Sequence, residues 1–418
     1  MVRGIPVIRQ MSPVSSIYNE PVECLKKGDS KKALLWLLEN GSAPGVRGIG
    51  TCSQKIAGKS RIKEMIRGIF KKAPLLSFGE SSFSQAGFES ALRNSRPPGY
   101  ADYFFHRYAN PSLLGAIPFL VILGDICRMK SSRLVVELLC GIGHSSALIA
   151  ALFPELKVVS ADIDFVNLFL AKTFLARNSA YLCMDAELPL PFKESSVGGL
   201  ICVDGLHYVR SKAALLQEVD RVVSADGNWL FAHMHNLNTP NPNLGAPLSA
   251  EGYETRFAFG QNRLLPEIEV LRQFQTDGSL DLTVQAESRT LVSSHALTLI
   301  GGRPDLLWKK HSGVENSLCR LAGLIDFNPI YQMEEASGGL TLRPKWPSDW
   351  LRSECAEKVP ILPDEVHVPS RVLKDISSFR KGGSFSEEVR KLLLSFVLVP
   401  LPECYPRKTL PGNGGAAS

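Results

Sequence analysis

The stretch Leu134-Val-Val-Glu137-Leu-Leu-Cys-Gly141-Ile-Gly143-His144 decides the fold of this chain. Residues 134–139 form a short, mainly apolar run that is typical of a buried strand, and a glycine turn follows at once. Glycine lets a backbone pass close to a ligand without a Cβ in the way, and the helix expected at 145–153 begins with free N–H groups. The stretch therefore predicts a strand, a ligand-binding turn and a helix, as dinucleotide-binding folds also have.

Further strands and helices alternate after this turn. Such alternation predicts a parallel sheet with helices on both faces, wound as a doubly wound α/β domain. Two later strands, at 279–284 and 296–301, are expected to add an antiparallel pair to the sheet. The other expected strands are 157–161, 180–184, 199–203 and 229–233, and the other expected helices are 165–177 and 212–223.

The regions on either side of this alternation differ from it. Amphipathic helices are expected at 20–40 and 60–72, with a glycine-rich loop at 41–58 between them. An aromatic-rich segment at 100–108 precedes an apolar helix at 113–127 that is too short to span a bilayer. We divide the chain into an N-terminal helical, basic segment (1–99), a core domain (100–302) and a C-terminal extension of unassigned fold (303–418).

Composition indicates a globular protein. Of 418 residues, 44% are hydrophobic, which is enough for a substantial core. The nine cysteines are scattered and include no Cys-x-x-Cys pair, so we expect reduced thiols and a cytoplasmic protein. The N-terminus has no long apolar run or cleavage site of the kind that marks a signal peptide.

Positive charge gathers at the N-terminal end. Residues 1–72 carry 14 Lys/Arg against 5 Asp/Glu, a net charge of +9, and the remainder of the chain carries −3. A basic segment of this kind either forms a solvated helix face or contacts an acidic partner, a phosphorylated substrate or a membrane surface. Its helix lacks the interleaved aromatic residues of a nucleic-acid platform, so nucleic acid is not the favoured partner.

Two carboxylates follow the glycine turn, each at the end of an expected strand. Asp162 lies 19 residues after Gly143, at the end of the second expected strand, where its carboxylate can accept both hydroxyls of a ribose. Asp185 ends the third expected strand, placed to accept a hydrogen bond from an adenine amino group. A dehydrogenase needs the first acid but not the second, so the pair disfavours a nicotinamide cofactor.

Five motifs in this order resemble those of class I S-adenosylmethionine (SAM)-dependent methyltransferases. The glycine stretch is similar to the family's acid-x-Gly-x-Gly-x-Gly motif, and Asp162-Ile163 matches its ribose-binding acid. Asp185-Ala-Glu-Leu-Pro-Leu-Pro-Phe192 is similar to the family's adenine-side motif. The segments 203–209 and 218–227 resemble the end of its fourth strand and the Glu-x-x-Arg-Val segment before its fifth.

This resemblance implies a seven-stranded Rossmann-like sheet and SAM as the cofactor. It is strongest to small-molecule methyltransferases, including those of ubiquinone and natural-product pathways, which implies a small-molecule acceptor; an oxygen nucleophile is our first choice. In such enzymes an aromatic segment before the core covers the pocket, a role that falls here to residues near Tyr103 and Arg107. The residues that the resemblance assigns to the cofactor are Glu137, Leu138, Cys140, Gly141, Gly143, Asp162, Ile163, Asp185, Ala186, Val203, Tyr103 and Arg107.

The candidate catalytic residues lie at the carboxyl ends of the fourth and fifth strands. His207 follows the fourth strand, and His233 and His235 follow the fifth. Histidine is the usual base near neutral pH, although each of these residues could instead have a structural role. Asp204 shares a loop with His207 and could orient an imidazole. His233-Met-His235 invites a metal interpretation, but no clear third ligand is nearby, and we predict no metal.

Departures from the family pattern leave alternatives open. Leu139 replaces the first glycine of the motif, and a side chain there would crowd the methionine end of SAM. One alternative is therefore a catalytically inactive, methyltransferase-like protein for binding or assembly. A second is an NAD-dependent oxidoreductase. Neither the oligomeric state nor the acceptor follows from the sequence.

Overall fold

The structure is a computed structural model that describes residues 5, 6, 27, 85–240, 245–257, 261–302, 304–357 and 360–407. The helices expected at 20–40 and 60–72 and the final residues 408–418 lie outside the described residues, apart from Lys27.

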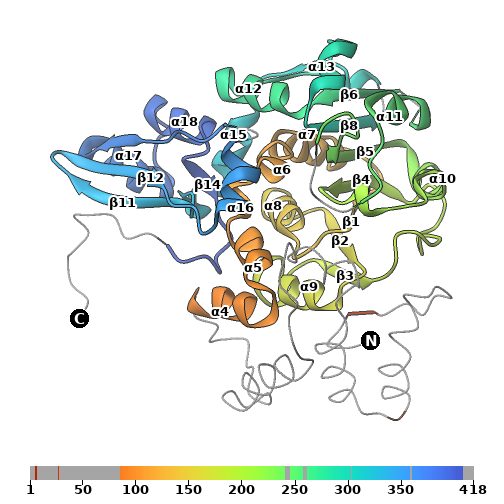
Figure 1. Cartoon of the computed structure of the whole chain (residues 1–418), viewed down its shortest axis with the longest axis horizontal. Helices are drawn as coiled ribbons and strands as arrows, with labels where there is room; N and C mark the ends of the chain where they lie inside the picture. Colours follow the sequence, from red (N-terminus) through yellow and green to blue (C-terminus); the bar gives the residue numbers. More distant parts are fainter. Residues whose placement is uncertain are drawn as a thin grey trace.

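A seven-stranded sheet forms the centre of the described chain, in the order β3-β2-β1-β4-β5-β8-β6 (Figure 1). Strands β1 to β5 run parallel, whereas β8 and β6 are antiparallel to their neighbours. This arrangement confirms the predicted doubly wound, Rossmann-like fold. The strands are β1 (Leu134–Leu138), β2 (Lys157–Asp162), β3 (Ala180–Cys183), β4 (Val197–Val203), β5 (Val223–His235), β6 (Asn262–Pro266) and β8 (Ala296–Gly302).

Alternate side chains of the sheet enter two different hydrophobic cores. Val135 packs in a core with α7 and α8, whereas its neighbour Val136 packs in a core with α10 and α11. Both faces of the parallel strands are therefore covered, which explains why their sequences are apolar without alternation. The helices around the sheet are α4 (Gln85–Ser95), α5 (Pro98–Phe105), α6 (Pro111–Leu114), α7 (Ile117–Cys127), α8 (His144–Leu152), α9 (Phe165–Leu170), α10 (Lys212–Val222), α11 (Ala250–Arg256), α12 (Glu267–Asp277) and α13 (Ser288–Ser293).

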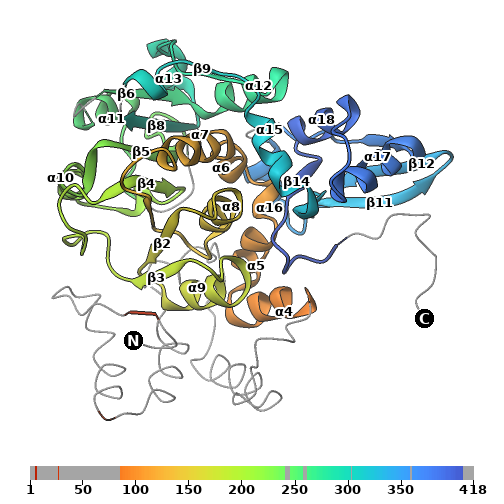
Figure 2. The same ribbon diagram turned by 180° about the vertical axis from the view of Figure 1, so that it is seen from behind.

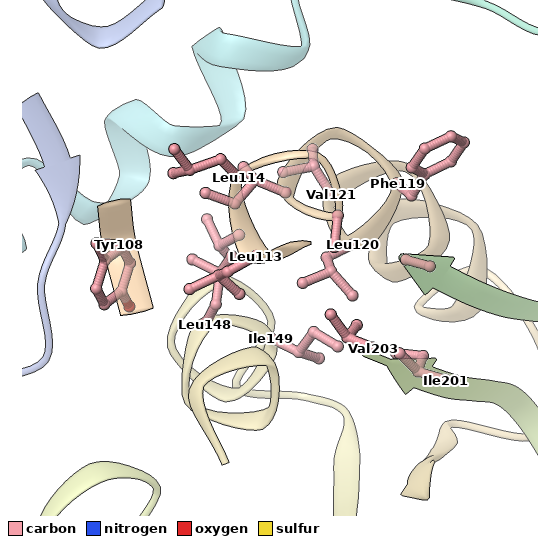
Figure 3. Close-up of a cluster of buried hydrophobic side chains, with 14 of the residues drawn as sticks. Tyr108, Leu113, Leu114, Phe119, Leu120, Val121, Leu148, Ile149, Ile201 and Val203 are labelled. Carbon is pink, nitrogen blue, oxygen red and sulfur yellow. The ribbon is translucent and has the colours of Figure 1, made fainter. Parts of the chain in front are cut away.

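The apolar segment expected as one helix at 113–127 is divided into α6 and α7. Pro118 cannot donate a backbone hydrogen bond, so it is tolerated only in the first turn of a helix, and it stands there in α7. Figure 3 shows Leu120 of α7 pointing toward Ile149 of α8 and Val203 at the end of β4. The two helices thus pack on the sheet next to the glycine turn.

The prediction that 279–284 completes the sheet is wrong. The strand beside β8 is β6, and only Leu280–Asp281 form a short strand, β7, which pairs with β9 (Lys310–His311) outside the main sheet. The carboxylates of Asp277 and Asp281 accept hydrogen bonds from the backbone N–H groups two residues further on, at 2.9 Å in each case. Such local bonds compete with a strand ladder, which explains the short pairing.

Two other expected elements differ in length from the prediction. The strand expected at 229–233 is the longer β5, which also includes residues 223–228, 234 and 235. The helix expected at 165–177 consists of α9 and a π-helical turn, η4 (Ala171–Leu175).

The C-terminal region, to which the sequence assigned no fold, has a core of its own around Phe327, Leu342 and Ile376. Figures 1 and 2 both show it beside the sheet domain. Its elements are α14 (Pro304–Leu307), α15 (Val314–Leu318), η6 (Cys319–Leu324), β10 (Ile325–Phe327), β11 (Tyr331–Ala336), β12 (Gly339–Pro344), α16 (Asp349–Arg352), η7 (Ser353–Glu357), β13 (Val366–Pro369), α17 (Ser370–Arg380), α18 (Glu387–Leu394) and β14 (Leu398–Pro400).

Buried polar contacts join this region to the sheet domain. The Tyr405 hydroxyl lies 2.8 Å from Nε2 of His144, in the first turn of α8. The Asn328 amide donates to the carbonyl oxygen of Tyr108 at 2.6 Å. The C-terminal region is thus fixed to the helix that follows the glycine turn. Among the described residues, no helix has both the length and the apolar character needed to cross a lipid bilayer.

Candidate cofactor and acceptor site

The glycine turn after β1 has left-handed backbone at three positions, of which only two are glycine. Gly141 and Gly143 have φ angles of +54° and +79°, and Leu139 has a φ angle of +52°. A side chain in this conformation costs about 1–2 kcal/mol, which is why glycine is usual there. Leu139 packs beside Gly205, where an added Cβ would come within 2.7 Å of the Leu139 Cβ. Gly205 therefore makes room for Leu139, and the turn keeps its path.

Several residues that the resemblance assigned to the cofactor face the protein interior. Glu137 is 2% exposed and accepts a hydrogen bond from the Ser146 backbone N–H at 2.9 Å, so it holds the start of α8. Burial raises the pKa of Glu137 to about 7. Leu138, Cys140 and Val203 are buried side chains of the hydrophobic cores. The side chains of these residues therefore support the carboxyl edge of the sheet from the protein interior.

The two carboxylates downstream of the turn are half-buried at the carboxyl edge of the sheet. Asp162 ends β2, and its two oxygens accept hydrogen bonds from the backbone N–H groups of Gly141 at 2.8 Å and Asp164 at 2.7 Å. Burial and the nearby Asp164 carboxylate raise the pKa of Asp162 to about 7. Asp185 lies two residues after β3 and accepts from the backbone N–H of Glu187 at 2.9 Å. Their half-buried neighbours are Ile163 and Ala186.

A polar cluster connects α5 with the end of β4. The Tyr103 hydroxyl donates a hydrogen bond to Asp204, and Arg107 donates to the same carboxylate oxygen at 3.1 Å. The Arg107 guanidinium also lies over the Tyr103 ring, 4.8 Å from its centre. Burial opposes the charged form of Asp204, but His233 and Arg107 outweigh it and lower the pKa of this carboxyl. Asp204 is therefore an anion that ties α5 to the sheet edge.

His233 lies in an irregular part of β5, where the pairing with β8 shifts between Phe231 and Met234. Its φ angle is +54°, so Leu139, Asp204 and His233 all place left-handed, non-glycine backbone directly after or at the ends of sheet strands. Such strained positions cluster at functional sites. Nδ1 of His233 lies 2.7 Å from Oε2 of Glu267, and Nε2 lies 3.8 Å from Oδ1 of Asp204.

The charge of His233 follows from these two carboxylates. Burial lowers the pKa of an imidazole, but Glu267 and Asp204 outweigh that effect and raise the pKa of His233 to about 9. Its side chain keeps 12% of its surface exposed. His233 is thus an imidazole oriented by Glu267 at Nδ1, with its second nitrogen, Nε2, on the side of Asp204.

His207 and His235 form a buried stack behind this edge. Their ring centres are 3.7 Å apart with an angle of 11° between the planes. Burial lowers the pKa of His207 to about 4 and that of His235 to about 2, so both rings are neutral. Neither ring nitrogen of His207 has a hydrogen-bond partner in the described part of the chain.

This stack bears on metal binding. One ligand atom from each of Asp204, His207 and His235 lies within 4.8 Å of the others. Imidazole binds a metal in the plane of its ring, and the nitrogen lone pairs of two stacked rings lie in separate, nearly parallel planes that do not meet at a common ion. Coordination by both rings would require one of them to rotate out of the stack.

Two residues that matter for this site were missed by the sequence interpretation. Glu267 begins α12 directly after Pro266, and an acid at a helix start was the available signal. Arg96 is buried and pairs with Asp164 through two hydrogen bonds of 2.9 and 3.0 Å. Because Asp164 is two residues after Asp162, this ion pair anchors α4 and α5 at the cofactor side of the edge.

The described sheet domain is an α/β domain in which a glycine turn and the carboxylates of Asp162 and Asp185 lie at the carboxyl ends of neighbouring strands. Residues 136–231 match the family model described as "Methyltransferase domain". This match and the motifs of the sequence support SAM as the cofactor. No curated protein matches the sequence.

Solved structures with similar chain paths include two bacterial methyltransferases. One is the O-methyltransferase of a trans-AT polyketide synthase of Brevibacillus brevis in complex with S-adenosylhomocysteine, at 14% identity and a TM-score of 0.32; the match covers 44% of this chain and 71% of that one. The other is geranyl diphosphate C-methyltransferase from Streptomyces coelicolor, at 14% identity and a TM-score of 0.30, covering 40% and 68%.

The residues at the edge fit SAM. The left-handed turn lets the backbone approach a ligand, and the N-cap residue of α8, Gly143, has no side chain between the helix start and a ligand. Each oxygen of Asp162 has a second lone pair, which is free to accept a ribose hydroxyl beside its bond to the backbone.

Proposed function

We propose that this chain is an enzyme that transfers a methyl group from SAM to an oxygen atom of a small-molecule acceptor. The methyltransferase domain and the Asp162 carboxylate support SAM binding. The observation that carries the acceptor chemistry is the pair of Glu267 and His233, because an oxygen nucleophile needs a base and this imidazole is held in the arrangement of one.

The reaction is an in-line displacement in which SAM supplies an electrophilic methyl group on sulfur. Glu267 accepts the Nδ1–H of His233 and thereby leaves Nε2 as the nitrogen that takes up the proton of the acceptor hydroxyl. The released oxygen electron pair forms the O–C bond, and the C–S electron pair stays on sulfur. His233 must first lose its own Nε2 proton, so methyl transfer should become faster as the pH rises toward 9.

The other polar residues of the edge position these groups. Asp204 fixes Tyr103 and Arg107, and with them α5, over the ends of β1 and β4. The buried, neutral rings of His207 and His235 stack next to His233. We infer that this stack keeps water away from the reacting oxygen.

Calorimetry with SAM, S-adenosylhomocysteine and NAD tests the cofactor. We expect both sulfur ligands to bind and NAD not to bind. Asp162→Ala should weaken S-adenosylhomocysteine more than tenfold, because a charged acceptor for the ribose is lost. Glu334→Ala, at an exposed position on β11, is the matched control and should leave the affinity unchanged. No binding of either sulfur ligand at millimolar concentration would refute the proposal.

Methyl transfer to a panel of phenols and alcohols, detected by mass spectrometry, tests the base. His233→Asn retains a residue that tolerates left-handed backbone, so the fold of the strand end should survive. We expect kcat to fall about a hundredfold or more, with unchanged affinity for S-adenosylhomocysteine. A variant with the full wild-type rate would show that His233 is not the base.

A further inference from the structure

The C-terminal region reaches the acceptor side of the site through α16 and η7. Figure 1 shows α16 beside α5, and the Trp350 ring centre lies 6.3 Å from that of Tyr103. The hydroxyl of the same Tyr103 donates a hydrogen bond to Asp204, directly after β4. Residues that follow β4 and residues more than 140 positions later in the chain therefore share one neighbourhood.

Two large exposed aromatic side chains, Tyr208 and Trp350, lie on the segments that follow β4 and that form α16. Six large apolar side chains are exposed among the described residues, and the two aromatic ones are Tyr208, 41% exposed, and Trp350, 37% exposed. Exposed aromatic surface is unfavourable in water, and it marks binding sites when it lies beside polar functional groups. Tyr208 directly follows His207, and their ring centres are 4.1 Å apart.

The aromatic residues at this position are held in place. Tyr103 is fixed at its hydroxyl by Asp204 and at its ring face by Arg107, and Tyr100 stacks on it with ring centres 6.2 Å apart. Rings that are already ordered lose little conformational freedom when a flat molecule packs on them. Arg107 is paired with Asp204 and His233 with Glu267, so the charge of each cation is offset by a carboxylate, and the surroundings favour an uncharged aromatic ring over an anion.

We propose that the acceptor carries an aromatic ring and that Trp350, from the C-terminal region, forms one wall of its binding site, with Tyr208 and Tyr103 as the others. This proposal rests on the proposed function and specifies the substrate class of the same site. It also assigns the C-terminal region a direct part in acceptor binding, since without Trp350 one side of the site is missing. Trp350 is a specificity-determining residue that takes no part in the proton transfer.

The test compares two probes of the same ring skeleton, 2-naphthol and decahydro-2-naphthol, which differ in aromatic character. Their affinities are measured by calorimetry on the full chain saturated with S-adenosylhomocysteine. We expect 2-naphthol to bind at least tenfold more tightly than the saturated alcohol. Trp350→Ala should weaken 2-naphthol about tenfold, as expected for one lost aromatic pair, and Trp350→Phe should recover most of the affinity.

Two further measurements separate the ways in which the proposal can fail. Met129→Ala removes another exposed apolar side chain, from the turn before β1 at the opposite end of that strand, and should change neither probe. The proposal for Trp350 is overturned if the two probes bind equally well, or if Trp350→Ala leaves the affinity for 2-naphthol unchanged. In either case, binding of S-adenosylhomocysteine would still support the proposed function. Loss of S-adenosylhomocysteine binding in the wild-type chain overturns the proposed function itself.

Discussion

The charge on His233 makes a quantitative prediction about stability. Its pKa is raised from the ordinary value of 6.5 to about 9 in the folded chain, so the folded state holds a proton that the unfolded state releases between these values. The stabilisation is fully present below pH 6.5 and is lost as the pH rises through about 9. At about 1.4 kcal/mol for each pKa unit, His233 should contribute about 3 kcal/mol to the free energy of unfolding at low pH.

Urea denaturation followed by tryptophan fluorescence measures this contribution. The free energy of unfolding is determined at pH 6.5 and pH 9 for the wild type and for His233→Asn, which removes the titrating group. Other groups titrate in both proteins and cancel in the comparison. We expect the wild type to lose about 2–3 kcal/mol more than the variant between the two pH values. Equal losses would show that His233 is not held as a cation by Glu267 and Asp204.

Two further predictions concern stability. Arg96→Ala should cost about 3–5 kcal/mol in thermal denaturation, because it leaves the buried Asp164 carboxylate unpaired. Arg343→Ala, whose partners Glu334 and Glu365 are exposed, should cost less than about 1 kcal/mol, and similar losses in the two variants would contradict the role of burial. Leu139→Gly should change stability little, because relief of the left-handed strain offsets the lost packing. Leu139→Val should be clearly destabilising, because a β-branched residue tolerates left-handed backbone poorly. Equal melting temperatures of these two variants would refute the strain at this position.

The central fold could be predicted because its signals are local. Apolar runs at β1, β2 and β4 are separated by amphipathic helices, and this spacing alone indicates parallel strands with crossovers. The far edge of the sheet could not be predicted in the same way. Residues 262–266 and 279–284 both contain strand-forming residues, and the choice of β6 depends on side-chain bonds from Asp277 and Asp281 that are invisible to pattern analysis.

The residues of the candidate site also differ in whether local sequence signals could predict them. Asp162 and Asp185 could be placed because they follow strands at fixed distances from the glycine turn. Glu267 and Trp350 reach the edge from elements far along the chain, so only the tertiary fold brings them to His233 and Tyr103. The charge states also depend on three-dimensional neighbours, which is why three similar histidines in the sequence become one cation and two neutral rings.

The contact between Tyr405 and His144 has a consequence for the synthesis of the protein. Its two partners are 261 positions apart, so the first turn of α8 acquires its buried partner only after Tyr405 has left the ribosome. Contacts of such long sequence separation slow folding and leave incomplete chains with exposed apolar surface. A premature stop codon even shortly before Tyr405 should therefore damage the cofactor end of the molecule, although every residue of the methyltransferase domain would already have been translated.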